Sequence, residues 1–339
     1  MTDRAASISA FLDGIGWGAA TRRNLAGDAS NRRYERLDLN GTPAVLMDAP
    51  PDKGEDVRPF IRIGGHLKAI GLSPPEILAQ DEELGFLLLE DLGDDLFARL
   101  LETDPSQELP LYLAATDALI DLHAAPLPSA PDYGPETMSD YACLATDWYA
   151  FGATGNRDTA ATQTLRAAML TAFDALQAWS AVLVLRDYHA ENLLWLSERQ
   201  GSARVGLLDF QDAGIGHPAY DLMSLARDAR REVSPATCEA MMARYVDATG
   251  YDAEGFARAC ATVSAQRNLR ILGVFARLSL HFGKAHYVDL IPRVWRNLQT
   301  DLSHPELSEL ARSIGQLLPE PTPEILTTLK AKCGTIPTL

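Results

Sequence analysis

The stretch 184–195, VLRDYHAENLLW, joins two apolar runs, Val182–Leu185 and Leu193–Trp195, through a short polar segment. This segment contains an arginine, an aspartate, a histidine and an asparagine. A turn between two strands needs only residues such as glycine, asparagine or aspartate. The additional charged and imidazole groups therefore indicate a chemical role, with Asp187 and Asn192 as the candidate functional side chains.

A second polar residue that follows an apolar strand lies downstream, in the sequence LLDFQDAG, where Asp209 comes directly after the strand 205–208. The strands 193–196 and 205–208 are expected to pair as a hairpin, with the residues between them as its loop. Such a hairpin would bring Asn192 beside Asp209, and Asp187 could converge with them at the same end. The sequence therefore predicts a cluster of two carboxylates and one amide.

The predicted cluster has the composition that phosphoryl transfer requires. Carboxylate and amide oxygens suit Mg²⁺, which usually completes its shell with water and substrate phosphates, and a further carboxylate could accept the proton of an attacking hydroxyl. The spacing Asp-x4-Asn at 187–192 matches the catalytic loop of kinases, and Asp209-Phe210 stands where their Asp-Phe-Gly motif begins. A two-metal phosphoesterase needs several more histidine and carboxylate ligands, and the 7 histidines form no second cluster.

The composition restricts the class of partner. The chain has 339 residues, of which 47% are hydrophobic, enough for two lobes with sizeable cores. Its formal net charge of −16 disfavours duplex nucleic acid and anionic membranes, so a small-molecule substrate is expected. The four cysteines are widely spaced, the N-terminus lacks a signal-peptide pattern, and no run approaches the ~20 apolar residues of a membrane span. We therefore expect a cytoplasmic protein and leave its oligomeric state open.

Residues 1–92 are expected to form a small nucleotide-binding lobe built on an antiparallel sheet. Alternating apolar residues, the hairpin signal Asn40-Gly41 and a helical face with spacings of 3 and 4 support this architecture. The expected elements are a helix at 8–12, strands at 22–27, 34–39 and 44–47, a helix at 55–70, and strands at 76–79 and 85–89.

Residues 93–339 are expected to form a larger, mainly helical lobe that carries the catalytic and substrate sites, with the boundary at Asp91-Leu92-Gly93. The fold class is thus α+β with two lobes. The expected helices are 111–123, 164–179, 218–231, 237–248, 256–281, 287–301 and 306–318, and the expected strands lie near 182–185, 193–196 and 204–208.

Three ordered motifs, RDYHAEN, LLDFQDA and HPAYDLMSL, resemble the aminoglycoside phosphotransferase and choline kinase superfamily. The resemblance implies a protein-kinase-like fold that uses ATP and Mg²⁺. It also implies that Asp187 is the catalytic base and that Asn192 and Asp209 hold Mg²⁺. His189 would support the catalytic loop or take part directly in the chemistry, and Asp221 would brace the loop from the following helix.

The segment AGDASNRRYERL stands where a kinase has its phosphate-covering loop, but it contains one glycine instead of three. The small residues Ala29 and Ser30 would still let backbone N–H groups approach phosphates. Arg32 and Arg33 add positive charge to a chain that has little of it. A solvated hairpin turn is the alternative interpretation.

The third strand, AVLMD, lacks the lysine that kinases direct at the phosphates. Arg32, Arg33 or Lys53 is therefore expected to neutralise phosphate charge, unless the nucleotide is held differently. GFLLLEDLG matches the hinge that bonds adenine through its backbone, with Glu90 to Leu92 as the contact stretch. An ordinary last strand and linker is the alternative.

These differences from the usual kinase pattern narrow the resemblance to one group within the superfamily. GDASNRRY, LMDAPP, FLLLEDLG and QRNLRILGVFARL resemble bacterial cell-wall sugar kinases that phosphorylate N-acetylmuramate and N-acetylglucosamine at the anomeric hydroxyl. This implies ATP-dependent formation of an amino-sugar 1-phosphate in peptidoglycan recycling. Arg267 and Arg270, continued by Arg277 and Lys284, form a basic stripe that would bind the lactyl carboxylate of N-acetylmuramate; a solvated helix face is the alternative.

Other functions remain open on the sequence alone. An aminoglycoside O-phosphotransferase would use the same motifs with an acidic pocket, and a kinase for choline or another small alcohol would need a different pocket. A non-catalytic nucleotide-binding module is a different class, against which the intact Asp187, Asn192 and Asp209 argue. The acceptor, its anomer and the choice between ATP and GTP are left open.

Overall fold

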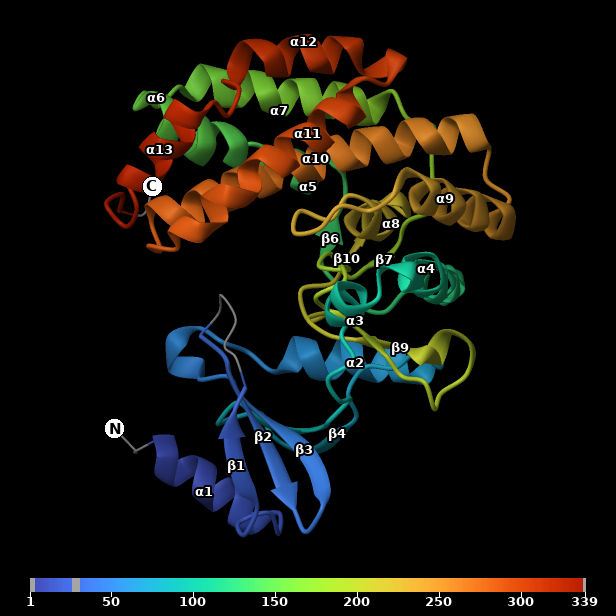
Figure 1. The fold of residues 1–339 in the computed structure, drawn as a ribbon, viewed down its shortest axis with the longest axis vertical. Coiled ribbons are helices and arrows are strands. Elements are labelled where there is room, and N and C mark those ends of the chain that lie inside the picture. Colours follow the sequence, from blue (N-terminus) through green and yellow to red (C-terminus); the bar gives the residue numbers. More distant parts are fainter. Residues whose placement is uncertain (1–3, 26–30, 338–339) are drawn as a thin grey trace. The chain divides into compact units, whose positions relative to one another are not determined.

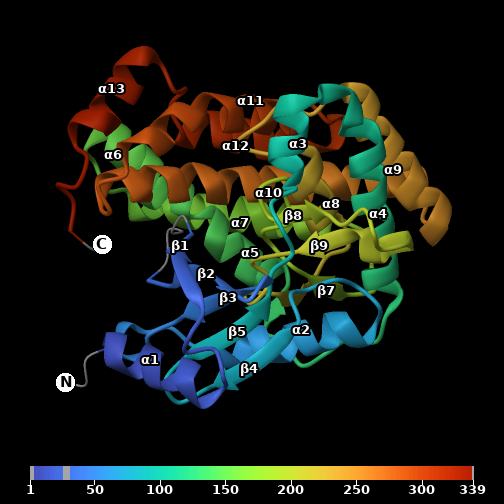
Figure 2. The same ribbon diagram turned by 60° about the horizontal axis from the view of Figure 1, so that its bottom comes forward.

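The computed structural model describes residues 4–25 and 31–337, which form two compact units (Figures 1 and 2). An antiparallel sheet in the first unit and a mainly helical second unit confirm the predicted α+β fold class. None of the described helices is long and apolar enough to cross a membrane. Unit 1 is Met1–Pro128 with Ala190–Ala213, and unit 2 is Ser129–His189 with Gly214–Leu339.

Unit 1 contains a five-stranded antiparallel sheet in the order β1-β2-β3-β5-β4, which confirms the five predicted strands. The hairpin predicted at Asn40-Gly41 is present, and both residues have the positive φ that this turn requires, 55° and 84°. The strands are β1 (Thr21–Asn24), β2 (Arg33–Leu39), β3 (Thr42–Asp48), β4 (Ile77–Asp81) and β5 (Phe86–Glu90). The helices are α1 (Arg4–Gly14), α2 (Arg58–Ala69), α3 (Phe97–Thr103) and α4 (Glu108–Ala124).

The two faces of this sheet have different neighbours because successive side chains of a strand point to opposite sides. On one face, Ile8 and Leu12 of α1 pack against apolar side chains of β2, β3 and β5. Val45 and Leu89 point to the opposite face of the sheet from the core residues beside them in their strands. Together with Phe60 of α2 they line a cavity. The sheet thus separates a closed core from a ligand-sized space.

The predicted hairpin of β8 (Leu193–Trp195) and β9 (Val205–Leu207) is present and belongs to unit 1. Backbone hydrogen bonds attach it to the rest of that unit. The N–H of Leu207 donates to the carbonyl of Ser73 at 2.9 Å, and the N–H of Trp195 donates to the carbonyl of Asp95 at 2.8 Å. The hairpin is therefore fixed relative to the five-stranded sheet.

Unit 2 is organised around the helix α10, which packs against α5, α8, α11 and the π-helix η3 (Figures 1 and 2). Gly273 of α10 is needed for this close packing, because a Cβ at this position would lie 2.2 Å from the backbone of Leu144. A small sheet with the order β6-β10-β7 completes the unit. Its strands are β6 (Asp132–Tyr133), β7 (Val182–Val184) and β10 (Gly214–Gly216). Its helices are α5 (Pro135–Ala142), η3 (Ala145–Ala150), α6 (Phe151–Thr154), α7 (Thr159–Asp174), α8 (Ala219–Ala226), α9 (Pro235–Thr249), α10 (Ala253–Leu280), α11 (Ile291–Leu302), α12 (Ser308–Leu317) and α13 (Pro323–Ala331).

The predicted helices are found with shifted ends. Helix α7 begins before its predicted start because the Asp158 side chain caps it, accepting a hydrogen bond from the N–H of Ala161 at 2.9 Å. Helix α8 ends at Ala226, five residues before its predicted end. The short elements α3, α5, α6, α13, β6 and β10 were not predicted, because few residues display too little of a periodic pattern.

The compact units do not divide at the predicted lobe boundary, Asp91-Leu92-Gly93. Helices α3 and α4 and the β8–β9 hairpin pack with the five-stranded sheet and so belong to unit 1. The predicted boundary concerns where the nucleotide-binding lobe ends, and it stays a prediction.

Candidate active site

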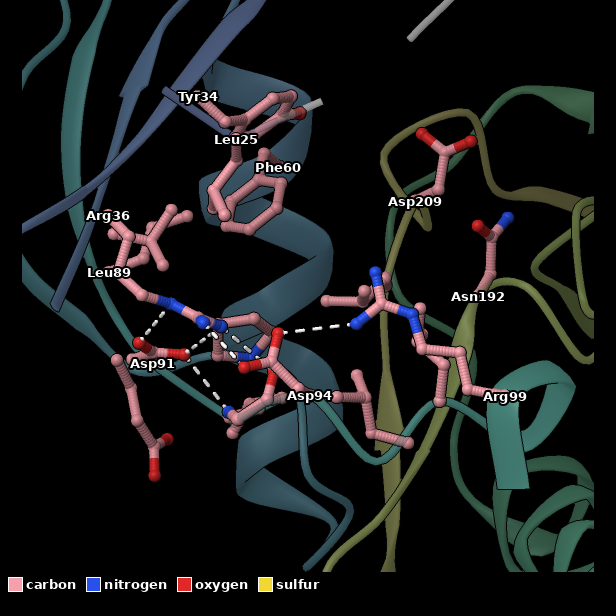
Figure 3. A pocket seen from close by; sticks show the side chains of 18 of the residues that line it. Leu25, Tyr34, Arg36, Phe60, Leu89, Asp91, Asp94, Arg99, Asn192 and Asp209 are labelled. Atoms are coloured by element: carbon pink, nitrogen blue, oxygen red, sulfur yellow. Dashed lines mark hydrogen bonds and ion pairs between the residues drawn. The ribbon is translucent and has the colours of Figure 1, made fainter. Parts of the chain in front are cut away.

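A cavity of about 340 Å³ lies in unit 1 beside the five-stranded sheet (Figure 3). Its apolar wall includes Leu25, Val45, Phe60 and Leu89, and Leu194 of the hairpin also lines it. Apolar walls with a few polar groups are typical of sites for small molecules and cofactors.

Residues 90–94 form one edge of this cavity. Arg36 lies 2.6 Å from a carboxylate oxygen of Asp91 and 2.6 Å from one of Asp94, and these ion pairs brace the segment (Figure 3). Within the described parts of the chain, neither the backbone amide nor the carbonyl of Leu92 forms a hydrogen bond. A backbone donor and acceptor without intramolecular partners thus lie at the cavity edge among the described residues, and the hinge role of Glu90 to Leu92 stays a prediction.

Arg32 supplies positive charge near this cavity, where the third strand has no lysine. Its Nε donates to Oε2 of Glu55 at 2.9 Å, and its Nη1 lies 3.9 Å from Oδ1 of Asp209. The N–H of Asn31 donates to the other Glu55 oxygen at 3.0 Å, which fixes the carboxylate. Burial opposes the charge of Arg32, but Tyr34, Glu55 and Asp209 outweigh it and raise the pKa of Arg32 above its ordinary value.

The hairpin brings Asn192 and Asp209 to the same wall of the cavity (Figure 3). The N–H of Leu208 donates to the carbonyl of Asn192 at 3.0 Å, so Asn192 lies opposite the strand end that leads to Asp209. Asp209 has a left-handed φ of 57°, uncommon for a residue other than glycine, and its Oδ1 accepts a hydrogen bond from Gln211 at 2.7 Å. The backbone conformation and this hydrogen bond therefore fix the orientation of the Asp209 carboxylate.

The amide and carboxylate oxygens of Asn192 and Asp209 fit a magnesium ion. Among the described residues, no group of three or more histidines, cysteines and carboxylates could hold a metal by itself. Mg²⁺ commonly takes only one or two protein ligands and completes its shell with phosphate oxygens and water. A metal bound here would therefore depend on a phosphate ligand in the same cavity.

In unit 2, the turn that carries Asp187 is clamped by Asp221 of α8. The fully buried Asp221 carboxylate accepts hydrogen bonds from the N–H of Leu185 at 2.5 Å and the N–H of Arg186 at 2.9 Å. Burial raises the pKa of Asp221 to about 7, although both hydrogen bonds favour its ionised form. Arg186 has a left-handed φ of 72°, and its guanidinium carbon lies 4.7 Å from the ring centre of Tyr133. The clamp and this contact hold a backbone turn that would otherwise be strained.

Asp187 itself is surrounded by positive charge. Burial alone would raise its pKa, but the charges of Arg270, His189 and Arg186, with a contribution from Arg267, hold the pKa of Asp187 below its ordinary value. The carboxylate is therefore ionised at neutral pH, although it is half-buried.

The two arginines predicted to bind substrate lie in the surroundings of Asp187. Arg267 is 3% exposed, and its Nη1 donates to the carbonyl of Arg227 at 3.4 Å. Arg270 donates to the hydroxyl of Tyr220 at 3.3 Å. Both arginines influence Asp187 electrostatically, and their direct contact with a substrate stays a prediction.

His189 is buried, and burial lowers its pKa to about 4, so the imidazole is neutral at neutral pH. Its Nε2 lies 3.4 Å from Nη1 of Arg230. A guanidinium can only donate, so Nε2 accepts and the ring hydrogen lies on Nδ1. The buried Nδ1 has no hydrogen-bond partner within the part of the chain that the structure describes.

The other predicted binding residues differ in their surroundings. Ala29 and Ser30 lie outside the described residues. Arg33 is exposed, because it points away from the face of β2 that lines the cavity. The Glu90 carboxylate pairs with Arg199 at 2.5 Å, and the backbone N–H of Glu90 donates to the carbonyl of Glu76. Its backbone donor is thus engaged within the sheet, in contrast to that of Leu92.

Sequence reasoning missed two residues of β2 that line the cavity, Tyr34 and Arg36. The signal that could have found them is the period of two along a strand. Arg32 was already a candidate, and residues two and four positions later point to the same side of the strand.

Residues 21–259 match the model described as the phosphotransferase enzyme family. The chain belongs to this family. Together with kinase-named relatives, this membership identifies it as an ATP-dependent kinase.

Two curated relatives cover most of this kinase. The N-acetylmuramate/N-acetylglucosamine kinase of Caulobacter vibrioides is 39% identical, over 95% of this chain and 98% of the relative. The protein of the same name from Pseudomonas aeruginosa is 35% identical, over 89% of this chain and 91% of the relative.

Solved structures with low sequence identity share the kinase's fold. A choline/ethanolamine kinase family protein from Mesorhizobium loti superposes with a TM-score of 0.61 and 15% identity, covering 97% of this chain and 100% of the other. Choline kinase LicA from Streptococcus pneumoniae gives a TM-score of 0.60 at 15% identity, with 87% and 99% covered. One LicA structure, with a TM-score of 0.58, is a complex with AMP. These likenesses confirm the predicted protein-kinase-like fold.

Proposed function

We propose that this kinase transfers the γ-phosphoryl group of ATP to the anomeric hydroxyl of N-acetylmuramate or N-acetylglucosamine. The names of relatives up to 39% identical over nearly the whole chain support the choice of acceptor. The observation that carries the proposal is the environment of Asp187, a half-buried carboxylate kept ionised by arginines on a clamped turn. Such a group is suited to orient a sugar hydroxyl. A reaction that consumes ATP also suits the cytoplasm as its setting.

The cavity of unit 1 would bind the nucleotide. The backbone amide and carbonyl of Leu92 would bond the adenine edge, and the apolar wall would cover its faces. Asn192 and Asp209 would hold Mg²⁺, which when bound neutralises phosphate charge and orients the γ-phosphoryl group. Arg32, fixed by Glu55, would contribute the positive charge that a strand lysine supplies in other kinases.

Asp187 would accept a hydrogen bond from the sugar hydroxyl and take its proton as the new P–O bond forms. Its lowered pKa makes it a weak base. This is compatible with phosphoryl transfer, in which positioning and electrostatic stabilisation dominate and the proton moves late. His189, neutral at neutral pH, would support the loop, and Asp221 would keep Asp187 directed at the acceptor.

The proposal is tested by measuring ADP release with a panel of N-acetylmuramate, N-acetylglucosamine, an aminoglycoside and choline. Turnover with the two amino sugars, and ³¹P NMR of a sugar 1-phosphate product, is the expected result. Turnover with the aminoglycoside or choline alone would replace the proposed acceptor. ATP binding without turnover on any acceptor would favour a non-catalytic module.

Asp187→Asn provides the matched test of the catalytic assignment, since it removes the charge and keeps the shape. We expect the loss of nearly all turnover, while the affinity for ATP measured by calorimetry changes little. Near-normal turnover in this variant would exclude Asp187 as the base.

A further inference from the structure

Unit 2 contains a second cavity, of about 640 Å³, at the C-terminal end of α10. Its other walls are the π-helix η3 and the beginning of α7. The lining side chains that bear on its chemistry are Asp147, Trp148, Arg157, Thr162, Arg277 and Phe282.

Two arginines in this cavity have no acidic partner among the described residues. Neither Arg157 nor Arg277 forms an ion pair there, and the buried Nε of Arg277 lacks a hydrogen-bond partner within the same described ranges. By contrast, Arg166 of α7 pairs with both Glu136 and Asp140. The described lining holds two guanidinium groups and one carboxylate, that of Asp147. Acidic residues outnumber basic ones in this chain by 46 to 30, so this local excess of positive charge points to an anionic ligand.

The remaining lining suits a sugar ring. Phe282 is 56% exposed at the cavity, and the buried Trp148 is joined to it through His281, whose ring centre lies 6.1 Å from that of Trp148 and 4.5 Å from that of Phe282. The exposed face of Phe282 therefore offers apolar surface to the C–H face of a pyranose, and the buried Trp148 supports it through His281. The Asp147 carboxylate accepts a hydrogen bond from the hydroxyl of Thr162 at 3.1 Å, and its second oxygen offers an acceptor for a sugar hydroxyl or amide.

Helix α10 connects this cavity with the surroundings of Asp187 in the same unit. Arg277 follows Arg270 by two helical turns, about 10 Å along the axis. Burial and the charge of Arg270 both lower the pKa of Arg277, and Tyr141 neighbours both arginines. The width of a hexosamine with a three-carbon acid substituent, added to the reach of an arginine side chain, can cover this separation.

We propose that this cavity is the acceptor subsite and that Arg277, assisted by Arg157, binds a carboxylate carried by the amino sugar. The inference rests on the proposed function and deepens it. Arg277 would set the preference for an acidic over a neutral amino sugar, while Arg267 and Arg270 act on Asp187 instead. N-acetylmuramate carries such a carboxylate and N-acetylglucosamine does not, so only the first sugar can make the proposed contact with Arg277.

The test measures kcat/KM for both sugars in the wild-type kinase and in Arg277→Gln. The ratio of the N-acetylmuramate value to the N-acetylglucosamine value should fall by about tenfold or more, the effect of one charge-assisted hydrogen bond, and mainly through KM. Arg277→Lys should restore part of the ratio. Arg296→Gln, on the exposed face of α11, removes the same charge outside the cavity and should leave the ratio unchanged.

An unchanged ratio in Arg277→Gln would overturn the inference and leave the proposed function standing. Failure of the wild-type kinase to phosphorylate either sugar would overturn both. If Arg277→Gln does not fold, as judged by circular dichroism, the exposed Arg157 takes its place: Arg157→Gln should lower the ratio by about threefold or more. An unchanged ratio in that variant would equally reject the subsite.

Discussion

Replacing Arg32 by glutamine is expected to reduce the use of ATP sharply. Arg32 and Glu55 are each only 14% exposed, and the guanidinium is held by Glu55 at 2.9 Å and lies 3.9 Å from Asp209. A hydrogen bond to a charged group contributes about 1.5–3 kcal/mol, so losing one contact with a phosphate should lower kcat/KM for ATP by about 10- to 150-fold. The loss should be seen when ATP is varied at saturating acceptor.

Neighbouring residues provide the controls for this prediction. Arg33→Gln removes the same charge one position later, on the opposite side of the strand, and should change kcat/KM for ATP by less than about threefold. Glu55→Gln keeps the charge of Arg32 but loosens its position, so an intermediate loss is expected. If Arg32→Gln and Arg33→Gln weaken ATP use equally, or if neither does, the assignment of Arg32 is refuted.

Three further predictions concern stability and the catalytic turn. Asp221→Asn should lower kcat more than ATP affinity, because an amide cannot accept both backbone N–H groups as a carboxylate does and the turn that carries Asp187 is loosened; an unchanged kcat would contradict the clamp. Burial raises the pKa of Asp301 from 3.8 to about 6, so its protonated form favours the folded state below pH 3.8, and up to about 3 kcal/mol of that stability is lost as pH rises through 6. Asp301→Asn should reduce this decrease in unfolding free energy, measured by urea titration over the same pH range. Gly273→Ala should destabilise by about 1–3 kcal/mol in thermal denaturation, despite the higher helix propensity of alanine, because its Cβ would meet the Leu144 backbone.

Much of the fold could be predicted from local pattern. The hairpin carrying Asn192 and Asp209 was correctly placed because its strands are apolar, close in sequence and separated by a polar loop. The end of α8 and the start of α7 were placed wrongly, since Asp158 caps α7 through a hydrogen bond that periodicity does not register. Local patterns thus locate elements better than their ends.

The candidate site was harder to predict, because its side chains meet over long sequence separations. The pairing of Arg32 with Glu55 joins residues 23 positions apart, and no local sequence pattern at either residue indicates that the other is its partner. The helical spacing of Arg267, Arg270 and Arg277 is confirmed, since all three lie on α10, but Lys284, the last member of the predicted stripe, lies beyond the end of this helix at Leu280. Spacing also does not say which part of a helix is buried. Arg267 proved to be 3% exposed, which excludes a solvated helix face at that position.

The composition of β3 has a consequence for chemical labelling of this kinase. Its sequence, TPAVLMD, offers no ε-amine, and no lysine lines the unit 1 cavity among the described residues. Acylating reagents that are delivered by a nucleotide react with a lysine amine, whereas an arginine guanidinium remains protonated and unreactive under the same conditions. Surveys of cellular kinases based on such reagents should therefore overlook this enzyme, and profiling it requires reagents directed at guanidinium groups or at carboxylates.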